Sequence, residues 1–369
     1  MTPYQFIQNK LADRALADSL RQLRLPSNAI DFYSNDYLGF ARSKELTELI
    51  EDEVSRHLPL LNGSTGSRLL AGNTAYAEDL ENTIAHYHKA EAALFFNSGY
   101  DANLGILSSL PQRGDTVIHD ELAHASIIDG IRLSHANRYS FNHNDLESLA
   151  GKLKSAKGIC YVVVESVYSM DGDLAPLADI VTICKAHNAS LIVDEAHALG
   201  VFDKGLVNQM NLQDDVFARV VTFGKALGTH GAVVLGTSAL RNYLINFARS
   251  FIYTTAAPLH QLASVKAGYK LLERSQQTIT QLKQNISTYA EMMVEAGYVS
   301  NTSAIQTVKV GGNEKTKAFA DKLQKAGLDV RPILSPTVPA GTERLRICLH
   351  TFNKIDEIEQ LVASVKTLR

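Results

Sequence analysis

Two short segments carry the residue types best suited to chemistry. Lys225 ends the stretch Thr222-Phe-Gly-Lys225, and Asp194-Glu-Ala-His197 lies upstream of it; each stands at the end of an apolar run. A lysine amine can form a Schiff base with an aldehyde, and a carboxylate can hold the proton of a pyridine nitrogen. An imidazole can hydrogen-bond to a ring hydroxyl. Pyridoxal phosphate requires these three groups, so the sequence predicts that cofactor.

Each of these residues also has a simpler structural interpretation. A lysine after a strand is usually a solvated surface residue, and an acid there can cap the next helix. Gly224 and Gly228 favour the chemical role of Lys225, because they let backbone and cofactor approach closely. Asp-Glu-Ala-His is also a helicase motif, but a helicase needs a Gly-x-x-x-x-Gly-Lys-Ser/Thr phosphate loop. The sequence contains no such loop.

Apolar, partly β-branched runs alternate with longer helical stretches from residue 74 onward. The runs are 93–96, 116–118, 159–164, 191–193, 220–222 and 232–235. Because they are apolar throughout, we expect strands covered on both faces in a mostly parallel α/β sheet. Ligands of such sheets bind beyond the carboxyl ends of the strands. Polar groups at those ends are Asn97-Ser98-Gly99, His119-Asp120, Glu165-Ser166, Asp194 and Lys225.

A candidate phosphate site follows the first of these runs. The stretch Asn97-Ser-Gly-Tyr-Asp101 joins a predicted strand to a predicted helix. Free backbone N–H groups at a helix N-terminus bind phosphate well, although an ordinary strand–helix turn has the same sequence character. The hydroxyl of Thr222 also suits a phosphate oxygen. His124 is compatible either with stacking on a flat ring or with a buried structural role.

The two ends of the chain differ from this central pattern. Apolar residues at helical spacing predict a helix in the first two dozen residues, closed by Pro26. Strands predicted at 305–310, 329–334 and 344–349, with two helices, form a small α+β domain, and Asn353 is expected to cap the last helix. We therefore divide the chain into an N-terminal helical segment (1–40), a large α/β domain (41–262) and a linking helix with the small domain (263–369).

Arg344 and Arg346 alternate with apolar residues in the last of these predicted strands, which places both on one face. One arginine facing a cleft could bind a substrate carboxylate in bidentate fashion. For Arg344 we expect the simpler alternative, a solvated strand face.

Composition excludes several classes of function. Lys plus Arg is 36 against 39 for Asp plus Glu, so a net charge of -3 gives no attraction to nucleic acid or an anionic membrane. The three cysteines, Cys160, Cys184 and Cys348, have neither metal-ligand nor disulfide spacing. The N-terminus lacks the apolar core of a signal peptide, and no apolar run could span a bilayer. We expect a cytoplasmic protein without a metal.

Eight motifs in this order resemble those of the α-oxoamine synthases, a branch of the fold-type I pyridoxal-phosphate enzymes. The motifs are Ser34-Asn-Asp-Tyr-Leu-Gly39, Gly63-Ser-Thr-Gly-Ser-Arg68, Ser98-Gly-Tyr-Asp-Ala-Asn103, His124-Ala-Ser126, Ser169-Met-Asp-Gly172, Asp194-Glu-Ala-His197, Thr222-Phe-Gly-Lys225 and Tyr253-Thr-Thr255. The resemblance covers nearly the whole chain. It implies the aspartate aminotransferase-like fold, with a mostly parallel central sheet and a smaller C-terminal domain.

The resemblance also implies a role for each candidate residue. Lys225 would bind the cofactor covalently and move protons at the substrate α-carbon, while Asp194 would pair with the pyridinium nitrogen. His124 would stack on the ring of the cofactor, and His197 and Ser169 would contact its hydroxyl. The Gly99 and Tyr100 amides and Thr222 would bind its phosphate. Thr254 and Thr255 would reach the phosphate in a partner subunit, so a homodimer is implied.

For the substrates, the resemblance implies that Arg346 and Asn35 bind the amino-acid carboxylate. Arg21 and Thr337 would lie along the acyl channel. The reaction of this branch is a decarboxylative condensation of an amino acid with an acyl thioester. The segments around Arg21, Gly72-Asn73 and 336–341 resemble those of members of this branch that use L-alanine, so the resemblance implies L-alanine with pimeloyl-CoA or a pimeloyl-acyl carrier protein as substrates.

Two alternatives stay open at this point. Another member of the branch would condense glycine with an acetyl thioester, or use a long-chain acyl thioester. A protein of another class would keep the fold for binding or regulation without catalysis.

Overall fold

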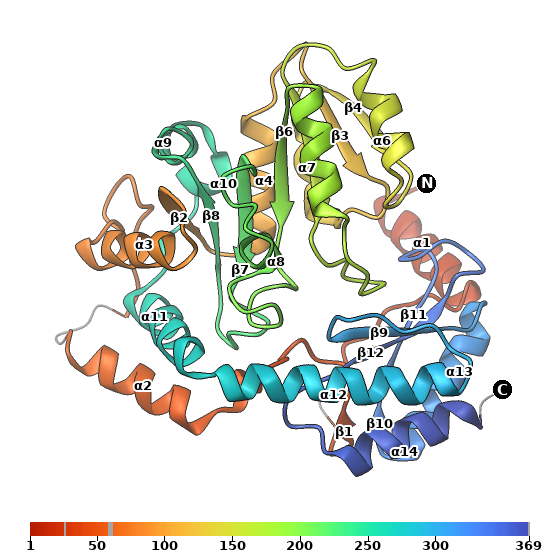
Figure 1. Cartoon of the computed structure of the whole chain (residues 1–369). Helices are drawn as coiled ribbons and strands as arrows, with labels where there is room; N and C mark the ends of the chain where they lie inside the picture. Colours follow the sequence, from red (N-terminus) through yellow and green to blue (C-terminus); the bar gives the residue numbers. More distant parts are fainter. Residues whose placement is uncertain (26, 58–61, 368–369) are drawn as a thin grey trace. The chain divides into compact units, whose positions relative to one another are not determined.

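The computed structural model describes the chain except for residues 26, 58–61 and 368–369 (Figure 1). Contacts divide the chain into two units. The large unit contains residues 36–169 and 174–280, and the small unit contains residues 1–35, 170–173 and 281–369. The N-terminal segment, which we treated as separate, therefore belongs to the same unit as the C-terminal residues, together with four residues from the middle of the chain.

A seven-stranded sheet forms the centre of the large unit. Its order is β2(Ala92–Phe96), β8(Ala232–Gly236), β7(Ala218–Thr222), β6(Ala189–Asp194), β5(Cys160–Glu165), β3(Thr116–Asp120) and β4(Asn137–Phe141). Only β8 runs against its neighbours, so the predicted mostly parallel sheet is confirmed. The strand that the sequence did not predict is β4. It lies at the sheet edge with four of its five residues exposed, so it lacks an apolar run.

Helices cover this sheet on both faces. Figure 1 shows α7 in front of the sheet and α4 behind it. The helical segments of the large unit are η1(Phe40–Arg42), α2(Lys44–Ser55), α3(Ala75–Tyr87), α4(Gly99–Ser109), α5(Ala125–Leu133), α6(Leu146–Leu153), α7(Leu177–Ala186), α8(Leu206–Gln209), α9(Ser238–Phe247), α10(Arg249–Ile252) and α11(Leu259–Arg274). Because both faces are covered, strand residues such as Val163, Ile192 and Val220 are at most 1% exposed.

The small unit is built on a second sheet. Its strands, in the order β11(Arg331–Ile333), β12(Arg344–Cys348) and β9(Ile305–Lys309), are antiparallel, and β1(Ile30–Asp31) pairs separately with β10(Leu328–Asp329). The helices here are α1(Pro3–Leu16), α13(Asn313–Lys325) and α14(Ile355–Lys366), and α12(Gln276–Glu295) continues into it from the large unit. The predicted strand 329–334 is interrupted at Val330, which lies between β10 and β11.

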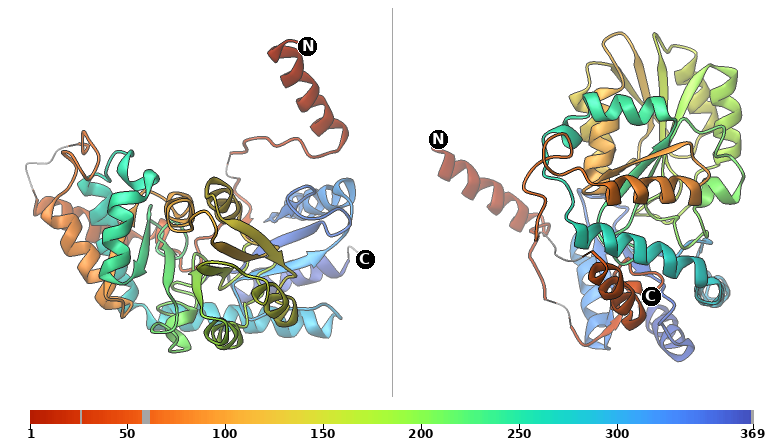
Figure 2. Two further views of the ribbon diagram at one scale, coloured as in Figure 1. Left: turned by 90° about the horizontal axis from the view of Figure 1, so that it is seen from above. Right: turned by 90° about the vertical axis from the view of Figure 1, so that its left-hand side faces the viewer.

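Two predictions for the helices of this unit are wrong in detail. The N-terminal helix ends at Leu16 rather than covering the first two dozen residues, because Asp18 adopts a left-handed conformation with φ 51°. No residue of α1 is buried, and Figure 2 shows it standing clear of the other helices of its unit. The cap of α14 is Lys354 rather than Asn353. The Asn353 side chain instead accepts a hydrogen bond from the backbone N–H of His350.

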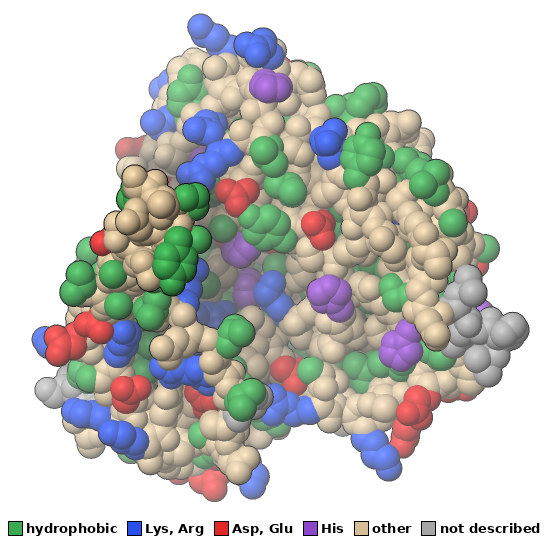
Figure 3. Space-filling view, turned by 180° about the vertical axis from the view of Figure 1, so that it is seen from behind, with side chains coloured by type: hydrophobic (Ala, Val, Ile, Leu, Met, Phe, Trp, Pro, Cys, Tyr) green, Lys and Arg blue, Asp and Glu red, His purple; other side chains and the backbone are tan. Residues whose placement is uncertain are grey.

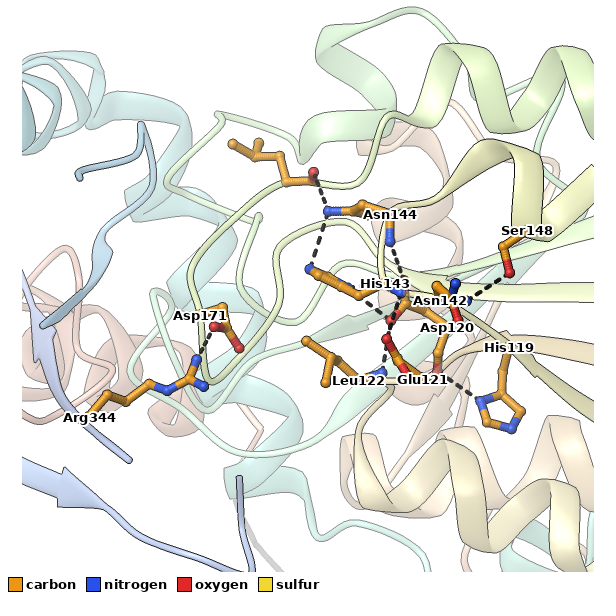
Figure 4. A network of polar contacts seen from close by, with 11 residues as sticks. His119, Asp120, Glu121, Leu122, Asn142, His143, Asn144, Ser148, Asp171 and Arg344 are labelled. Atoms are coloured by element: carbon orange, nitrogen blue, oxygen red, sulfur yellow. Dashed lines mark hydrogen bonds and ion pairs between the residues drawn. The ribbon is translucent and has the colours of Figure 1, made fainter. Parts of the chain in front are cut away.

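Arg344 does not lie on a solvated face, contrary to the prediction. It is 4% exposed, because β12 is the central strand of its sheet. Its guanidinium forms an ion pair with Asp171, which belongs to the short central segment of the same unit (Figure 4). A buried charge requires an opposite charge nearby, and the sequence pattern of β12 alone did not reveal this partner.

The surface and the cysteines agree with the composition. Figure 3 shows basic and acidic side chains interspersed over one face of the molecule. All three cysteines are buried and free. In the part of the chain that the structure describes, no helix combines the length and apolar character needed to cross a bilayer.

Candidate active site

The candidate residues of the large unit collect at the carboxyl ends of its parallel strands. Asp194 is the last residue of β6, Glu165 the last of β5, and Lys225 follows β7 by three residues. The parallel register pairs Glu165 directly with Asp194 and Asp194 with Val220. Residues that are distant in the sequence therefore meet at the carboxyl ends of the strands, where parallel α/β sheets bind their ligands.

The N-terminus of α4 lies against Thr222. The helix begins at Gly99, and Ser98 caps it by accepting a hydrogen bond from the Asp101 N–H at 3.1 Å. A Cβ at Gly99 would lie 2.5 Å from Thr222 Cγ2, so only glycine allows this approach. Lys225 Nζ lies 3.4 Å from Thr222 Oγ1. Helix N–H groups, a hydroxyl and an ammonium thus meet at one place, and this donor set fits a phosphorylated aldehyde cofactor.

A hydrogen-bonded chain connects Asp194 to His124. Asp194 is 6% exposed; its Oδ1 accepts from the Ala196 N–H at 2.8 Å and its Oδ2 from Asn103 Nδ2 at 2.7 Å. The same Asn103 nitrogen donates to Ser126 Oγ at 2.9 Å, and Ser126 Oγ lies 2.8 Å from His124 Nδ1. The sequence motifs contained Asn103 and Ser126, but the spacing gave no signal of this contact.

His124 caps helix α5 with its own ring. Its Nδ1 accepts a hydrogen bond from the Ser126 N–H at 3.2 Å. Burial lowers the pKa of His124, the Asp194 carboxylate raises it, and the Lys225 charge lowers it. The ring is therefore neutral near pH 7. Since Nδ1 accepts, the proton of the neutral ring is on Nε2.

A buried network holds the loop that carries His124. Asp120 is fully buried at the end of β3 and accepts from the Leu122 N–H at 2.8 Å and the Asn144 N–H at 3.0 Å. His143 Nδ1 lies 2.9 Å from Asp120 Oδ1, as Figure 4 shows. The His143 ring packs edge-on against Tyr168, with centroids 4.5 Å apart. The Asp120 carboxylate thus fixes the start of the loop that carries His124. It also positions His143, whose ring contacts Tyr168, the residue before Ser169.

His197 and Ser169 are both buried, at 6% and 8% exposure. His197 Nδ1 lies 2.7 Å from the hydroxyl of Tyr37, a residue to which sequence reasoning gave no role. Tyr37 is fully buried, and it belongs to the Ser34–Gly39 motif. The Tyr37 contact orients the imidazole.

Glu165 is a second buried carboxyl beside Asp194. It is 3% exposed, and burial raises its pKa to about 8, assisted by the neighbouring Asp194 charge. The backbone N–H groups of His124 and Ser169 and the Lys225 charge oppose this rise. Glu165 therefore carries the proton at neutral pH.

We expect Glu165→Gln to change how stability depends on pH. Glu165 keeps its proton in the folded state up to about pH 8, whereas in the unfolded chain it ionises near its ordinary value of 4.5. The wild-type free energy of unfolding therefore falls between these pH values, and glutamine removes that loss. Relative to wild type, the variant should gain roughly 2–4 kcal/mol between pH 5 and 8.

Urea unfolding at pH 5 and pH 8 measures this difference. Glu359→Gln, at an exposed position of α14, is the control and should show no such trend. A constant difference between wild type and Glu165→Gln at the two pH values would mean that Glu165 is ionised in the folded protein.

Thr254 and Thr255 lie in the connection between α10 and α11. Asn97 Nδ2 donates to Thr254 Oγ1 at 3.1 Å and to the Thr255 carbonyl at 2.8 Å. Asn97 directly follows β2 and precedes the α4 cap. Asn97 therefore holds the two threonines near the end of β2, beside the candidate phosphate site. In that site the Tyr100 hydroxyl donates a hydrogen bond to Asp129.

The small unit brings its predicted substrate residues together in pairs. Arg346 is 7% exposed and donates from Nη2 to Asn35 Oδ1 at 2.9 Å. Its Nη1 contacts Cys348 Sγ at 2.9 Å, a neighbour that the sequence did not suggest. Arg21 Nη2 donates to Thr337 Oγ1 at 3.1 Å, although these residues lie at opposite ends of the chain.

Comparison with known proteins identifies the family. The model for aminotransferase class I and II matches residues 27–364. The 8-amino-7-oxononanoate synthase of Emericella nidulans is 42% identical, over 93% of this chain and 90% of its own length. The chain belongs to the class I and II aminotransferase family, in its 8-amino-7-oxononanoate synthase branch. A putative 8-amino-7-oxononanoate synthase of Bacillus licheniformis is 37% identical over 99% of this chain and 97% of its own length.

Solved structures agree with this assignment. The crystal structure of 8-amino-7-oxononanoate synthase from Francisella tularensis has a TM-score of 0.79 and 30% identity, covering 92% of this chain and 97% of its own. A serine palmitoyltransferase from S. paucimobilis with bound PLP has a TM-score of 0.90 and 26% identity, covering 100% of this chain and 98% of its own. The predicted fold-type I architecture is confirmed.

Proposed function

We propose that this protein is a pyridoxal-phosphate-dependent 8-amino-7-oxononanoate synthase. It condenses L-alanine with a pimeloyl thioester, releases carbon dioxide and forms 8-amino-7-oxononanoate for biotin synthesis. The observation that carries the proposal is the convergence of Lys225, Asp194 and the α4 N-terminus at one sheet edge. Relatives named for this activity, at 37–42% identity over at least 93% of the chain, support the choice of reaction.

The residues of the large unit would hold the cofactor in a defined orientation. The Gly99 and Tyr100 N–H groups and Thr222 would bind its phosphate, His124 would stack on its ring, and Asp194 would pair with its ring nitrogen. Lys225 would attach it covalently, and Ser169 and His197 would hydrogen-bond to its hydroxyl. When bound, pyridoxal phosphate supplies an electron sink for the carbanion formed at the α-carbon of the amino acid.

Proton transfer at the substrate falls to Lys225. The Lys225 amine would remove the α-proton of the amino acid and return a proton after decarboxylation. The Asp194 carboxylate would hold a proton on the ring nitrogen of the cofactor, which would strengthen the electron sink that the cofactor supplies. Arg346, with Asn35, would bind the alanine carboxylate by charge-assisted hydrogen bonds. Arg21 and Thr337 would line the channel for the pimeloyl chain.

A substrate panel tests the proposal against its nearest alternatives. Alanine, glycine and serine would each be combined with pimeloyl, acetyl and palmitoyl thioesters, and thiol release would be measured. We expect the fastest release with alanine and pimeloyl-CoA or a pimeloyl-acyl carrier protein. Faster release with glycine and acetyl-CoA would replace the proposal with a glycine acetyltransferase. No release in any combination would favour a non-catalytic binding protein.

The proposal includes a homodimer in which Thr254 and Thr255 reach the phosphate of the partner subunit. Hydrogen bonds from Asn97 hold both threonines in a defined position after α10. Light scattering of the cofactor-loaded protein is expected to give twice the mass of the chain. A fully active monomer would remove the role of both threonines in the partner's site.

A further inference from the structure

We propose that Asn103 is a positioning residue of the active site: its amide nitrogen binds Asp194 and, through the Ser126 hydroxyl, orients the His124 ring. The inference rests on the proposed function and deepens it. Asn103 itself would touch neither cofactor nor substrate. It would act through the two residues that contact opposite parts of the cofactor ring, its nitrogen and its face.

The hydrogen bonds of Asn103 define the direction of each contact. Its Nδ2 carries two protons, and one is directed to Asp194 Oδ2 at 2.7 Å and the other to Ser126 Oγ at 2.9 Å. Since the Asp194 carboxylate only accepts, the amide cannot be rotated to place its oxygen there. Ser126 Oγ accepts from Asn103, so its own hydroxyl proton is available for His124 Nδ1 at 2.8 Å. The proton of the neutral imidazole must then be on Nε2.

The other end of the Asn103 side chain argues against a purely structural role. Asn103 is 2% exposed, and among the described residues its Oδ1 has no hydrogen-bond partner. A buried acceptor without a partner is destabilising. An apolar side chain of similar size would avoid the free-energy cost of the unpaired oxygen. The two hydrogen bonds that Asn103 donates must therefore offset this cost.

Asn285 in α12 shows what a structural asparagine looks like in the same chain. It is fully buried, donates to the carbonyls of His350 and Asn353 at 2.8 and 2.9 Å, and accepts from Gln281 at 2.9 Å. Both ends of its amide are used, and it contacts no candidate site residue. Asn103, by contrast, donates both amide protons to site residues, Asp194 and Ser126, and its Oδ1 accepts no hydrogen bond from the described residues.

The geometry also explains how one residue links three elements. Asn103 lies one turn into α4, Ser126 lies at the start of α5, and Asp194 ends β6. The helix that presents its N-terminus to the phosphate therefore also holds the carboxylate expected at the ring nitrogen. Binding of the phosphate at the α4 N-terminus and pairing at the ring nitrogen would be geometrically coupled through this helix.

The test uses Asn103→Leu and Ser126→Ala in the full-length protein labelled with 15N-histidine. In wild type, the imidazole nitrogens of His124 should show the Nε2–H tautomer without cofactor. Asn103→Leu should shift the His124 Nδ1 resonance, because the Ser126 hydroxyl is no longer held as its donor, while the residue 126 N–H keeps the Nε2–H tautomer. It should also weaken pyridoxal-phosphate binding about tenfold and lower kcat about tenfold with little change in KM. Ser126→Ala should also shift the Nδ1 resonance, because the hydroxyl is lost, and leave cofactor affinity within about threefold, because the Asn103–Asp194 bond remains.

Asn285→Leu is the matched control, since it removes a buried asparagine of the small unit. It should lower the unfolding temperature without shifting the His124 Nδ1 resonance or changing the cofactor affinity. An unchanged Nδ1 resonance in both Asn103→Leu and Ser126→Ala would overturn the inference. If Asn103→Leu does not fold, Ser126→Ala decides the question. The Nδ1 resonance is read without substrates, so a failure of the proposed reaction in the substrate panel is a separate result.

Discussion

Lys225→Ala is expected to abolish turnover, with kcat reduced by at least 10³-fold. The substitution removes the amine that would attach the cofactor and the base that would act at the substrate α-carbon, and general acid–base catalysis alone contributes about 10²–10⁴-fold. The fold should survive, because the Lys225 side chain is only partly buried at a strand end. Borohydride reduction of the wild-type holoenzyme, followed by peptide mass spectrometry, should find the cofactor on Lys225 alone.

Two further variants make this result specific. Lys225→Arg keeps the positive charge without a nucleophilic amine and should be as inactive as Lys225→Ala. Lys185→Ala removes an exposed lysine of α7 that pairs with Asp215 at 2.5 Å, and its activity should equal that of wild type. If Lys225→Ala keeps more than a tenth of the activity, or if borohydride labels another lysine, the assignment of Lys225 is wrong.

The sequence predicted much of the large unit because its signals are local. Runs such as 159–164 are apolar throughout, and strands in a covered parallel sheet have this composition. The positions of Asp194 and Lys225 followed from the same pattern, since parallel strands end at one edge. The edge strand β4 was missed for the converse reason, because four of its five residues are exposed and carry no apolar signal.

Contacts between distant residues could not be predicted in this way. Asn103 and Asp194 are 91 positions apart, and Tyr37 and His197 are 160 apart. Their hydrogen bonds depend on how helices and loops meet above the sheet, which no spacing in one sequence encodes. Arg344 is the clearest failure, because alternation in β12 suggested a solvated face. The carboxylate of Asp171, far away in the sequence, allows that arginine to be buried.

Asp194→Asn is expected to lower kcat by about 10²–10³-fold, the usual effect of removing one preorganised electrostatic contact from a reacting centre. Asparagine keeps the shape of the side chain, and its oxygen can still accept from Asn103 or from the Ala196 N–H. What it loses is the negative charge that would hold the proton on the ring nitrogen. Since that charge matters most when the carbanion forms, the KM for alanine should change much less than kcat.

Glu195→Gln is the matched control, because it neutralises a buried carboxyl one residue further along. Glu195 is fully buried but faces a different partner, Arg219, at 3.9 Å, and accepts from the Val207 N–H at 2.9 Å. Its loss should affect stability and leave kcat within about tenfold of wild type. Equal losses of kcat in Asp194→Asn and Glu195→Gln would point to general disruption of the β6 end. A large loss confined to Asp194→Asn would support a carboxylate acting on the cofactor ring, in the position where Asn103 holds it.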